Sequence, residues 1–178
     1  MLQTVTESAI PFSLDEFRDH CSIAPDEREH DPALRRALYA AAVFVESKAG
    51  IRLRGSTLYD YFRGRPGPFR FLSGPVNSVS VVRDMTAGAD VDATAWELDL
   101  VGQWPSLRSL TDSTWNPTST YRITWTAGYP TIPHDLHAVV FLVAAEYFEN
   151  REASTPVAMH ALPLSVASIL QGYGPRET

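Results

Sequence analysis

The sequence contains very little cysteine and very little lysine. Cys21 is the only cysteine, and Lys48 is the only lysine among the 15 basic residues of the 178-residue chain. A single cysteine excludes an internal disulfide, so we expect a reducing compartment and a buried, unreactive thiol. Arginine in place of lysine suits bidentate ion pairs at interfaces, although a GC-rich genome produces the same bias.

Targeting segments, membrane spans and an excess of basic charge are also lacking. The N-terminal stretch MLQTVTESAIPF has no basic residue and no long apolar run, so we expect no signal peptide. No stretch reaches the ~18 apolar residues of a membrane span. The formal net charge of −6 argues against a protein that binds nucleic acid through a basic face.

Basic residues do gather in one part of the sequence. Such a group is more typical of a solvated strand face than of a binding site. Its members, against only Asp60 as a nearby acid, are Arg52, Arg54, Arg63, Arg65 and Arg70.

Two helices are predicted in the first fifty residues. Ser13 and Glu16 form a capping-box pattern, which predicts a short helix over 14–21. Asp31 is expected to cap a second helix over 32–49, which starts at Pro32. Apolar residues recur there at helical spacing, and Gly50 is the expected C-cap.

The middle of the chain has the texture of a β-sheet. Short β-branched and aromatic runs over 56–126 are separated by Gly- and Pro-rich turns, which predicts a small antiparallel sheet. In YRITW, residues 121–125, apolar and polar residues alternate as in a half-buried strand. The stretch GQWPSLRSLTDSTWNPTS is predicted to be a long loop with two tryptophans, and loops of this length are usually functional or mobile.

The stretch WTAGYPTIPHDL, residues 125–136, predicts a fixed corner between the last strand and a helix. Gly128 is expected at positive φ, Pro130 stiffens the turn, and Pro133 is the expected first helical residue. We expect Trp125 and Tyr129 to anchor this corner.

Two helices are predicted after the corner. The first, over 133–150, is apolar nearly all round, which indicates either central burial or a subunit interface. A last short helix follows in LPLSVASILQGYG, between Pro163 and Gly172. A helix this short needs a surface to pack on, and both its own core and a partner protein are open alternatives.

These elements predict an α+β fold that is mainly helical. We expect a single domain over 1–178, because the length and the 44% of hydrophobic residues are ordinary for one globular domain. A small helical bundle over 13–50 and 130–172 would form the core, with the helices at 32–49 and 133–150 in contact. The antiparallel sheet over 56–126 would be inserted into it.

Few residues in the sequence suggest chemistry. His134, Asp135 and His137 are the nearest approach to a metal or acid–base cluster, but they fall in the first turn of a helix, where Asp135 suits the helix dipole. GRPGP lacks the Lys-Ser/Thr of a phosphate loop. Side chains of adjacent residues diverge, which argues against a His20–Cys21 catalytic pair. We therefore expect no enzyme, no catalytic residue, no metal and no cofactor.

The order of the parts resembles a known family, the head–tail connector (adaptor) proteins of long-tailed phages, prophages and gene transfer agents. The resemblance covers essentially the whole chain. It rests on the opening helix SLDEFRDHCSI, the second helix DPALRRALYAAAVFVESKAGIRL, the strand FLSGPVNSVSVV, and the segment ITWTAGYPTIPHDLHAVVFLVAAEYFENRE. The first helix departs from the family in carrying His20 and Cys21 near its end.

The resemblance implies a structural role at the head–tail junction of a virion or phage-like particle made in the bacterial cytoplasm. The chain would form a ring beneath the portal protein, dodecameric in the particle, and the resemblance allows a monomer in isolation, since such rings often assemble only on their template. It would line the channel for passing double-stranded DNA without sequence-specific binding and provide the platform for a stopper or tail-completion protein. No membrane partner is expected.

The expected contact residues lie at helix ends. Subunit or portal contacts are predicted at the charged ends of the second and third helices and along the apolar last helix: Arg35, Arg36, Glu146, Glu149, Arg151, Glu152, Leu164, Ile169, Leu170 and Tyr173. The alternative hypothesis is a small dimeric binding or regulatory module without catalysis, which would call for a basic recognition helix. The third hypothesis is a hydrolase with an unrecognised active site.

Overall fold

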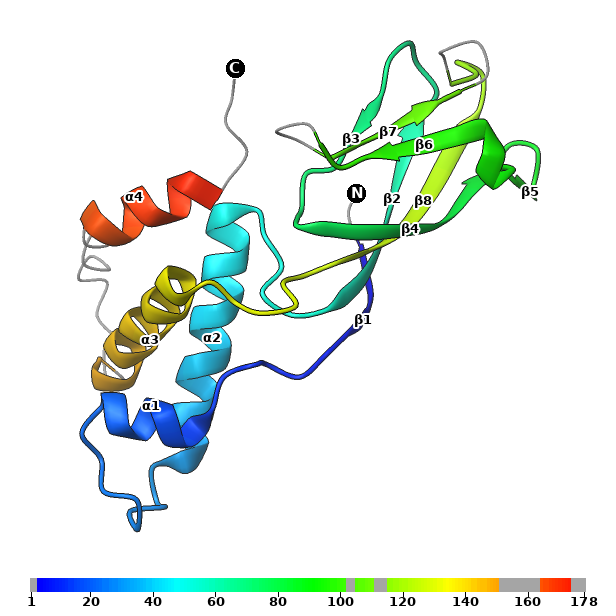
Figure 1. The fold of residues 1–178 in the computed structure, drawn as a ribbon. Helices are drawn as coiled ribbons and strands as arrows, with labels where there is room; N and C mark the ends of the chain where they lie inside the picture. Colours follow the sequence, from blue (N-terminus) through cyan, green and yellow to red (C-terminus); the bar gives the residue numbers. More distant parts are fainter. Residues whose placement is uncertain (1–2, 102–104, 111–114, 151–163, 174–178) are drawn as a thin grey trace. The chain divides into compact units, whose positions relative to one another are not determined.

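The structure is a computed structural model, and it describes residues 3–101, 105–110, 115–150 and 164–173. The chain divides into two compact units. One combines Met1–Ala9 with Arg54–Pro130, and the other combines Ile10–Leu53 with Thr131–Thr178. Figure 1 shows that the strands belong to the first unit and the helices to the second. Both units are therefore assembled from segments that are distant in sequence.

The β-unit contains two antiparallel sheets. The five-stranded sheet has the order β1-β2-β8-β4-β5, and the three-stranded sheet has the order β3-β7-β6. The strands of the first are β1 (Gln3–Glu7), β2 (Ser56–Arg63), β8 (Thr120–Ala127), β4 (Val76–Asp84) and β5 (Ala89–Asp90). Those of the second are β3 (Phe69–Arg70), β7 (Ser106–Ser109) and β6 (Trp96–Asp99), with the 3-10 turn η1 (Ala93–Ala95) leading into β6.

The β-unit corrects the sequence analysis in two respects. The prediction of one small sheet over 56–126 is wrong, because there are two sheets and β1 from the N-terminus pairs with β2. The prediction that GQWPSLRSLTDSTWNPTS is one long loop is also wrong. It contains β7, which pairs with both β3 and β6, and Trp115, which is only 3% exposed.

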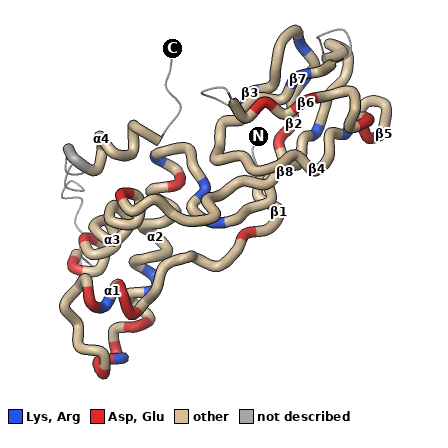
Figure 2. The backbone as a smooth tube through the Cα atoms, in the orientation of Figure 1, with Lys and Arg blue, Asp and Glu red and all other residues tan. Residues whose placement is uncertain are grey.

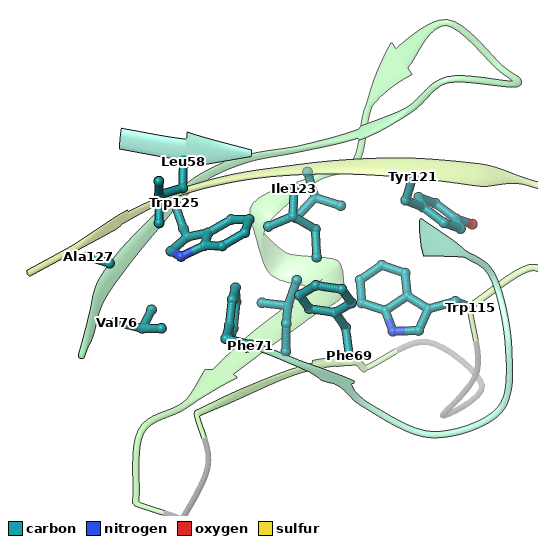
Figure 3. Close-up of a cluster of buried hydrophobic side chains, with 11 residues drawn as sticks. Leu58, Phe69, Phe71, Val76, Trp115, Tyr121, Ile123, Trp125 and Ala127 are labelled. Atoms are coloured by element: carbon teal, nitrogen blue, oxygen red, sulfur yellow. The ribbon is translucent and has the colours of Figure 1, made fainter. Parts of the chain in front are cut away.

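The core of the β-unit joins the two sheets. Aromatic rings fill it, and β8 supplies alternate residues, which confirms the predicted alternation along that strand. Figure 3 shows these side chains converging from several strands. The buried cluster consists of Leu58, Phe69, Phe71, Val76, Val82, Leu107, Trp115, Tyr121, Ile123, Trp125 and Ala127.

The helical unit is built around α2 (Asp31–Ala49) and α3 (His134–Glu149). These two helices pack against each other, which confirms the predicted contact. The short helix α1 (Leu14–His20) packs on α2, and α4 (Leu164–Tyr173) contacts both α2 and α3. The buried residues of α3 occupy one broad face: Leu136, Val139, Val140, Phe141, Val143 and Ala144.

Several helix ends follow from local chemistry. The Ser13 hydroxyl oxygen accepts a hydrogen bond from the Glu16 backbone N–H at 3.4 Å, as the capping box predicts. Gly50 ends α2 in the left-handed region, with φ of 65°, so the predicted C-cap is confirmed. The helices account for about 36% and the strands for about 30% of the structure. The fold is thus α+β, with comparable shares of each rather than mainly helical.

Three predicted end residues differ from their observed places. Asp31 does not cap α2 from outside; it is the first helical residue, and His30 precedes it without a side-chain cap. Pro133 is the N-cap of α3 rather than its first residue. Gly172 lies inside α4, which continues to Tyr173. Of the described helices, none is both long enough and apolar enough to cross a bilayer.

Candidate functional site

The corner after β8 is tightly built around Gly128. This glycine has φ of 129°, as predicted, and its backbone N–H donates to the Pro75 carbonyl oxygen at 2.9 Å. The Asn77 side-chain amide donates to the Gly128 carbonyl oxygen at 3.0 Å. A Cβ at position 128 would lie 2.3 Å from the Arg54 carbonyl oxygen. Two strands and the Arg54 backbone therefore enclose this residue, and only glycine fits.

The other predicted corner residues have different surroundings. Trp125 is 1% exposed and its ring lies 5.1 Å from that of Phe71, so it belongs to the core of the β-unit. Tyr129 is half-buried and Pro130 is exposed. Pro133 belongs to the helical unit, at the start of α3.

Four of the five arginines that gather in the sequence have different surroundings. Arg54 is 8% exposed and pairs with Glu7 at 2.8 Å, and Arg52 lies 3.5 Å from Glu46. Phe62 and Phe69 contact each other from the two sheets, with ring centroids 5.0 Å apart. Because side chains alternate along a strand, the adjacent Arg63 and Arg70 are directed to opposite outer faces.

Acidic residues, in contrast, lie close together in the helical unit. Figure 2 shows them along α1 and in the loop that leads to α2. The exposed acids of this region are Asp15, Glu16, Asp19, Asp26, Glu27 and Glu29. Arg28 lies 3.5 Å from Asp15 within the same group. This part of the surface is unsuited to a nucleic-acid phosphate backbone.

The predicted charged contact residues on α2 and α3 are exposed. Arg35 and Arg36 lie in the first two turns of α2, and Glu146 and Glu149 lie in the last turn of α3. Glu146 accepts a hydrogen bond from the Asn150 side-chain amide at 2.7 Å. Arg151 and Glu152 fall outside the described residues.

The last helix packs on its own unit. Val166 is 1% and Leu170 is 4% exposed, while Ile169 is half-buried. The Tyr173 hydroxyl donates to the Asp135 carboxylate, with distances of 2.7 and 2.8 Å to its two oxygens. Of the two alternatives that the sequence left open, packing on its own core is therefore what this chain shows. The Leu164 side chain and Pro163 fall outside the described residues.

Of the two histidines that suggested chemistry, His134 is exposed in the first turn of α3 and His137 serves packing. His137 lies between Phe12 and Phe141, with ring centroids 5.3 and 4.3 Å away, and its Nε2 lies 3.6 Å from Glu16. Among the residues that the structure describes, no three His, Cys, Asp or Glu side chains are placed to share a metal ion. Cys21 is only half-buried, but burial raises the pKa of its thiol, and the nearby Glu149 adds to this. A raised pKa keeps the thiol protonated and unreactive.

A buried ion pair that the sequence analysis missed joins α1 to α2. Arg18 is 2% exposed, and its Nε donates to Asp31 Oδ1 at 2.9 Å. Arg18 also pairs with Asp15. The hydrogen bond from Arg18 holds the pKa of the Asp31 carboxyl below its ordinary value of 3.8, and partial burial opposes this only in part. The role of Asp31 is thus to fix α1 on α2.

A buried acid, Glu46, closes the end of α2. Glu46 is 5% exposed, and its Oε1 accepts a hydrogen bond from the Leu53 backbone N–H at 2.8 Å. Its backbone carbonyl oxygen accepts from Gly50 and from Ile51. The stretch VESKAG therefore fixes the path of the chain after α2. The Gly50 C-cap was predicted from the sequence, whereas the contact of Glu46 with Leu53 was not.

We expect the Arg18–Asp31 pair to make the protein sensitive to acid. A lowered carboxyl pKa stabilises the folded state above the ordinary pKa of an aspartate, and this contribution is lost as pH falls through the folded-state value. In urea titrations between pH 7 and pH 3, Asp31→Asn should therefore show a smaller loss of stability on acidification than the wild type. Asp26→Asn, in the exposed adjoining loop, is the control. Parallel pH dependence of wild type and Asp31→Asn would contradict the assignment.

Comparison with known proteins finds similarity only among solved structures. No protein family and no curated protein matches the sequence. A chain in the virion of a native gene transfer agent particle is 26% identical, with a TM-score of 0.81. A chain in the neck of an empty particle of this kind, computed with C6 symmetry, is 28% identical, with a TM-score of 0.78. A chain in the neck of a native particle, computed with C12 symmetry, is 26% identical, with a TM-score of 0.76. Each match covers 100% of this chain and 97% of the other.

Proposed function

We propose that this chain is a structural subunit of the neck of a gene transfer agent or a related phage-like particle. The observation that carries the proposal is the full-length similarity to chains of such particles, at 26–28% identity and with TM-scores of up to 0.81. Both units take part in the match, since it covers all of this chain and 97% of each neighbour. A chance resemblance of one common supersecondary motif would not extend across both.

Within the neck, we propose the role of head–tail connector, or adaptor, in a symmetric ring. The neck structures with similar chains were computed with C6 and C12 symmetry, which supports a ring and suits a dodecamer. The ring would bind the portal protein on one side and a stopper or tail-completion protein on the other. The sequence motifs that resemble the connector family support this finer assignment.

The charge of the chain suits a channel through which DNA must pass. The net charge is −6, and the exposed acids of the helical unit lie close together. Like charge keeps a DNA backbone from adhering to a channel wall. We propose that passing double-stranded DNA meets this ring without sequence-specific contacts, and that the role is structural rather than catalytic.

Two groups of residues are proposed for contacts within the particle. The charged ends of α2 and α3, with Arg151 and Glu152, would serve subunit contacts. The last helix, with Leu164, Ile169, Leu170 and Tyr173, would contribute to portal or subunit contacts. Leu170 is 4% exposed, so its part in such a contact would be to hold the helix in place.

The test of the proposed function is deletion of the gene, followed by purification of the particles. We expect capsids that package DNA but carry no tail and then lose their DNA, because the platform for the tail is missing. A plasmid copy of the gene should restore tailed particles. Electron cryomicroscopy of the restored particles should show this fold in the neck. The proposal would be contradicted if the deletion strain produced tailed particles that still infect cells or transfer genes.

A measurement of mass separates the proposal from the dimeric-module alternative. Purified chain mixed with purified portal protein should form a complex that carries several copies of the chain per portal ring. A chain that stays a dimer at every concentration, with portal protein present, would favour the alternative.

A further inference from the structure

Helix α2 carries a stripe of exposed residues. Arg36, Ala40, Val43 and Ser47 recur at spacings of four, three and four residues, and all are exposed. Tyr39 lies beside them and is 50% exposed, while Val43 is 40% exposed. The stripe thus has a cation at its N-terminal end and apolar side chains in its middle.

Helix α3 carries a second exposed stripe with the reverse charge. Ala138, Leu142 and Glu146 recur every four residues, Glu149 follows, and all are exposed. Leu142 is 51% exposed even though the rest of this apolar helix supplies the core of the unit. This stripe has apolar side chains in its middle and acids at its C-terminal end.

We propose that the α2 stripe of one subunit packs antiparallel on the α3 stripe of the next subunit in the ring. In this register, Arg36 meets Glu146, and Val43 meets Ala138. The spans agree, because seven residues of α2 and eight of α3 each cover about 10–12 Å at 1.5 Å per residue. The apolar centre would contain Tyr39, Val43 and Leu142, and aromatic and arginine side chains are the usual energetic centres of interfaces.

Charge pairing selects this arrangement over others. A parallel pairing that places Arg36 beside Ala138 would put Glu146 beside Val43 and Glu149 beside Ser47, so that neither acid meets the cation. Two α2 stripes facing each other would bring Arg36 next to Ser47 and Lys48, with no acid from either stripe. Of these three arrangements, only the antiparallel contact between α2 and α3 pairs the cation with the acids and the apolar centres with each other.

A contact between two different stripes is heterologous, and repetition of a heterologous contact forms a ring where the rotation between neighbours closes. This inference rests on the proposed function, because the neck ring supplies the neighbouring copy. It adds to that function by naming the two surfaces and their register.

Cysteine cross-linking tests the register directly. In a Cys21→Ser background, Val43→Cys and Ala138→Cys are introduced together, since a disulfide forms only where the two Cα atoms lie within about 7 Å. After mild oxidation of assembled particles, we expect a ladder of linked subunits on a non-reducing gel. Each single-cysteine chain should stay monomeric. A matched control combines Ala138→Cys with Ser80→Cys, an exposed position in the β-unit, and should give no ladder.

Charge reversal provides a second, independent readout in the same two-cysteine chain. Arg36→Glu should lower the yield of linked subunits by about tenfold or more, because it places like charges together in an interface. Adding Glu146→Arg in the same chain should restore the yield, since every contact then contains the reversed pair. Thermal melts of the purified variants should match the parent chain, because both side chains are exposed.

The outcomes separate the inference from the proposed function. Particles whose necks contain the two-cysteine chain but yield no ladder would overturn the register while leaving the neck assignment intact. Dimers from Val43→Cys alone would mean that the α2 stripe meets itself, which also overturns the inference. Absence of the wild-type chain from purified necks would overturn the proposed function.

Discussion

Replacing Gly128 with valine is expected to lower the melting temperature of the protein by roughly 10 °C or more. The reason is a combination of two effects at one residue. Gly128 has φ of 129°, where side chains are rarely tolerated, and this strain alone costs on the order of 1–3 kcal/mol. A Cβ would also lie 2.3 Å from the Arg54 carbonyl oxygen and 2.9 Å from the Gly55 nitrogen.

The collision at Gly128 is with backbone atoms, so no side chain can turn away to relieve it. Relief requires movement of the segment at Arg54 and Gly55, just before β2, or of β8 itself. Such movement would disturb the pairing of Ser56 with Ala127. We therefore expect the loss of stability to exceed the strain term.

Gly88→Ala is the matched control for the Gly128 variant. Gly88 also has a positive φ, of 71°, but a Cβ there would meet no atom within 4 Å. Gly88→Ala should lower the free energy of unfolding by only about 1 kcal/mol, because it introduces backbone strain but no collision. Thermal unfolding followed by circular dichroism measures the melting temperatures of the Gly128→Val and Gly88→Ala variants. Equal melting temperatures for Gly128→Val and the wild type would refute the account of the corner.

Replacing Trp115 with alanine is expected to destabilise the protein by about 3–5 kcal/mol, the usual loss when a large aromatic side chain is removed from a core. The indole ring is 3% exposed and contacts Phe62 and Tyr121, with ring centroids 5.3 and 5.1 Å away. Its removal would leave a cavity between the two sheets that neighbouring rings cannot fill. Chemical denaturation of the purified chain measures the difference.

Two further substitutions make the Trp115 prediction specific. The indole Nε1 of Trp115 is buried and has no hydrogen-bond partner among the described residues, so Trp115→Phe should lose much less stability than Trp115→Ala. Leu110→Ala removes an apolar side chain that is 53% exposed and should change stability by less than about 0.5 kcal/mol. A Trp115→Ala variant as stable as Leu110→Ala would show that this residue lies in a loop, as its sequence context suggested.

The sequence by itself determined the elements whose signals are local. The Ser13 cap, the Gly50 C-cap and the alternation along β8 each depend on residues within a few positions, so the local sequence pattern predicted them correctly. The positive φ of Gly128 was readable for the same reason, since a strand ended there and a Tyr-Pro followed. The exposed charges proposed for subunit contacts, Arg36 and Glu146 among them, could also be named from helix ends alone.

The tertiary structure decided what depends on partners distant in the chain. β1 was not predicted from the sequence, because its five residues are exposed and its strand is defined by pairing with β2, about fifty residues later. Trp115 is buried because Phe62 and Tyr121 surround it, and Arg18 because Asp31 neutralises it. The sequence showed that α3 is apolar nearly all round, but it did not show which apolar side chains of α2 and α3 would stay exposed, Val43 and Leu142 among them. The periodicity of a sequence shows where the apolar residues of a helix lie. Only the packed structure shows which of those residues are buried in the core and which stay exposed.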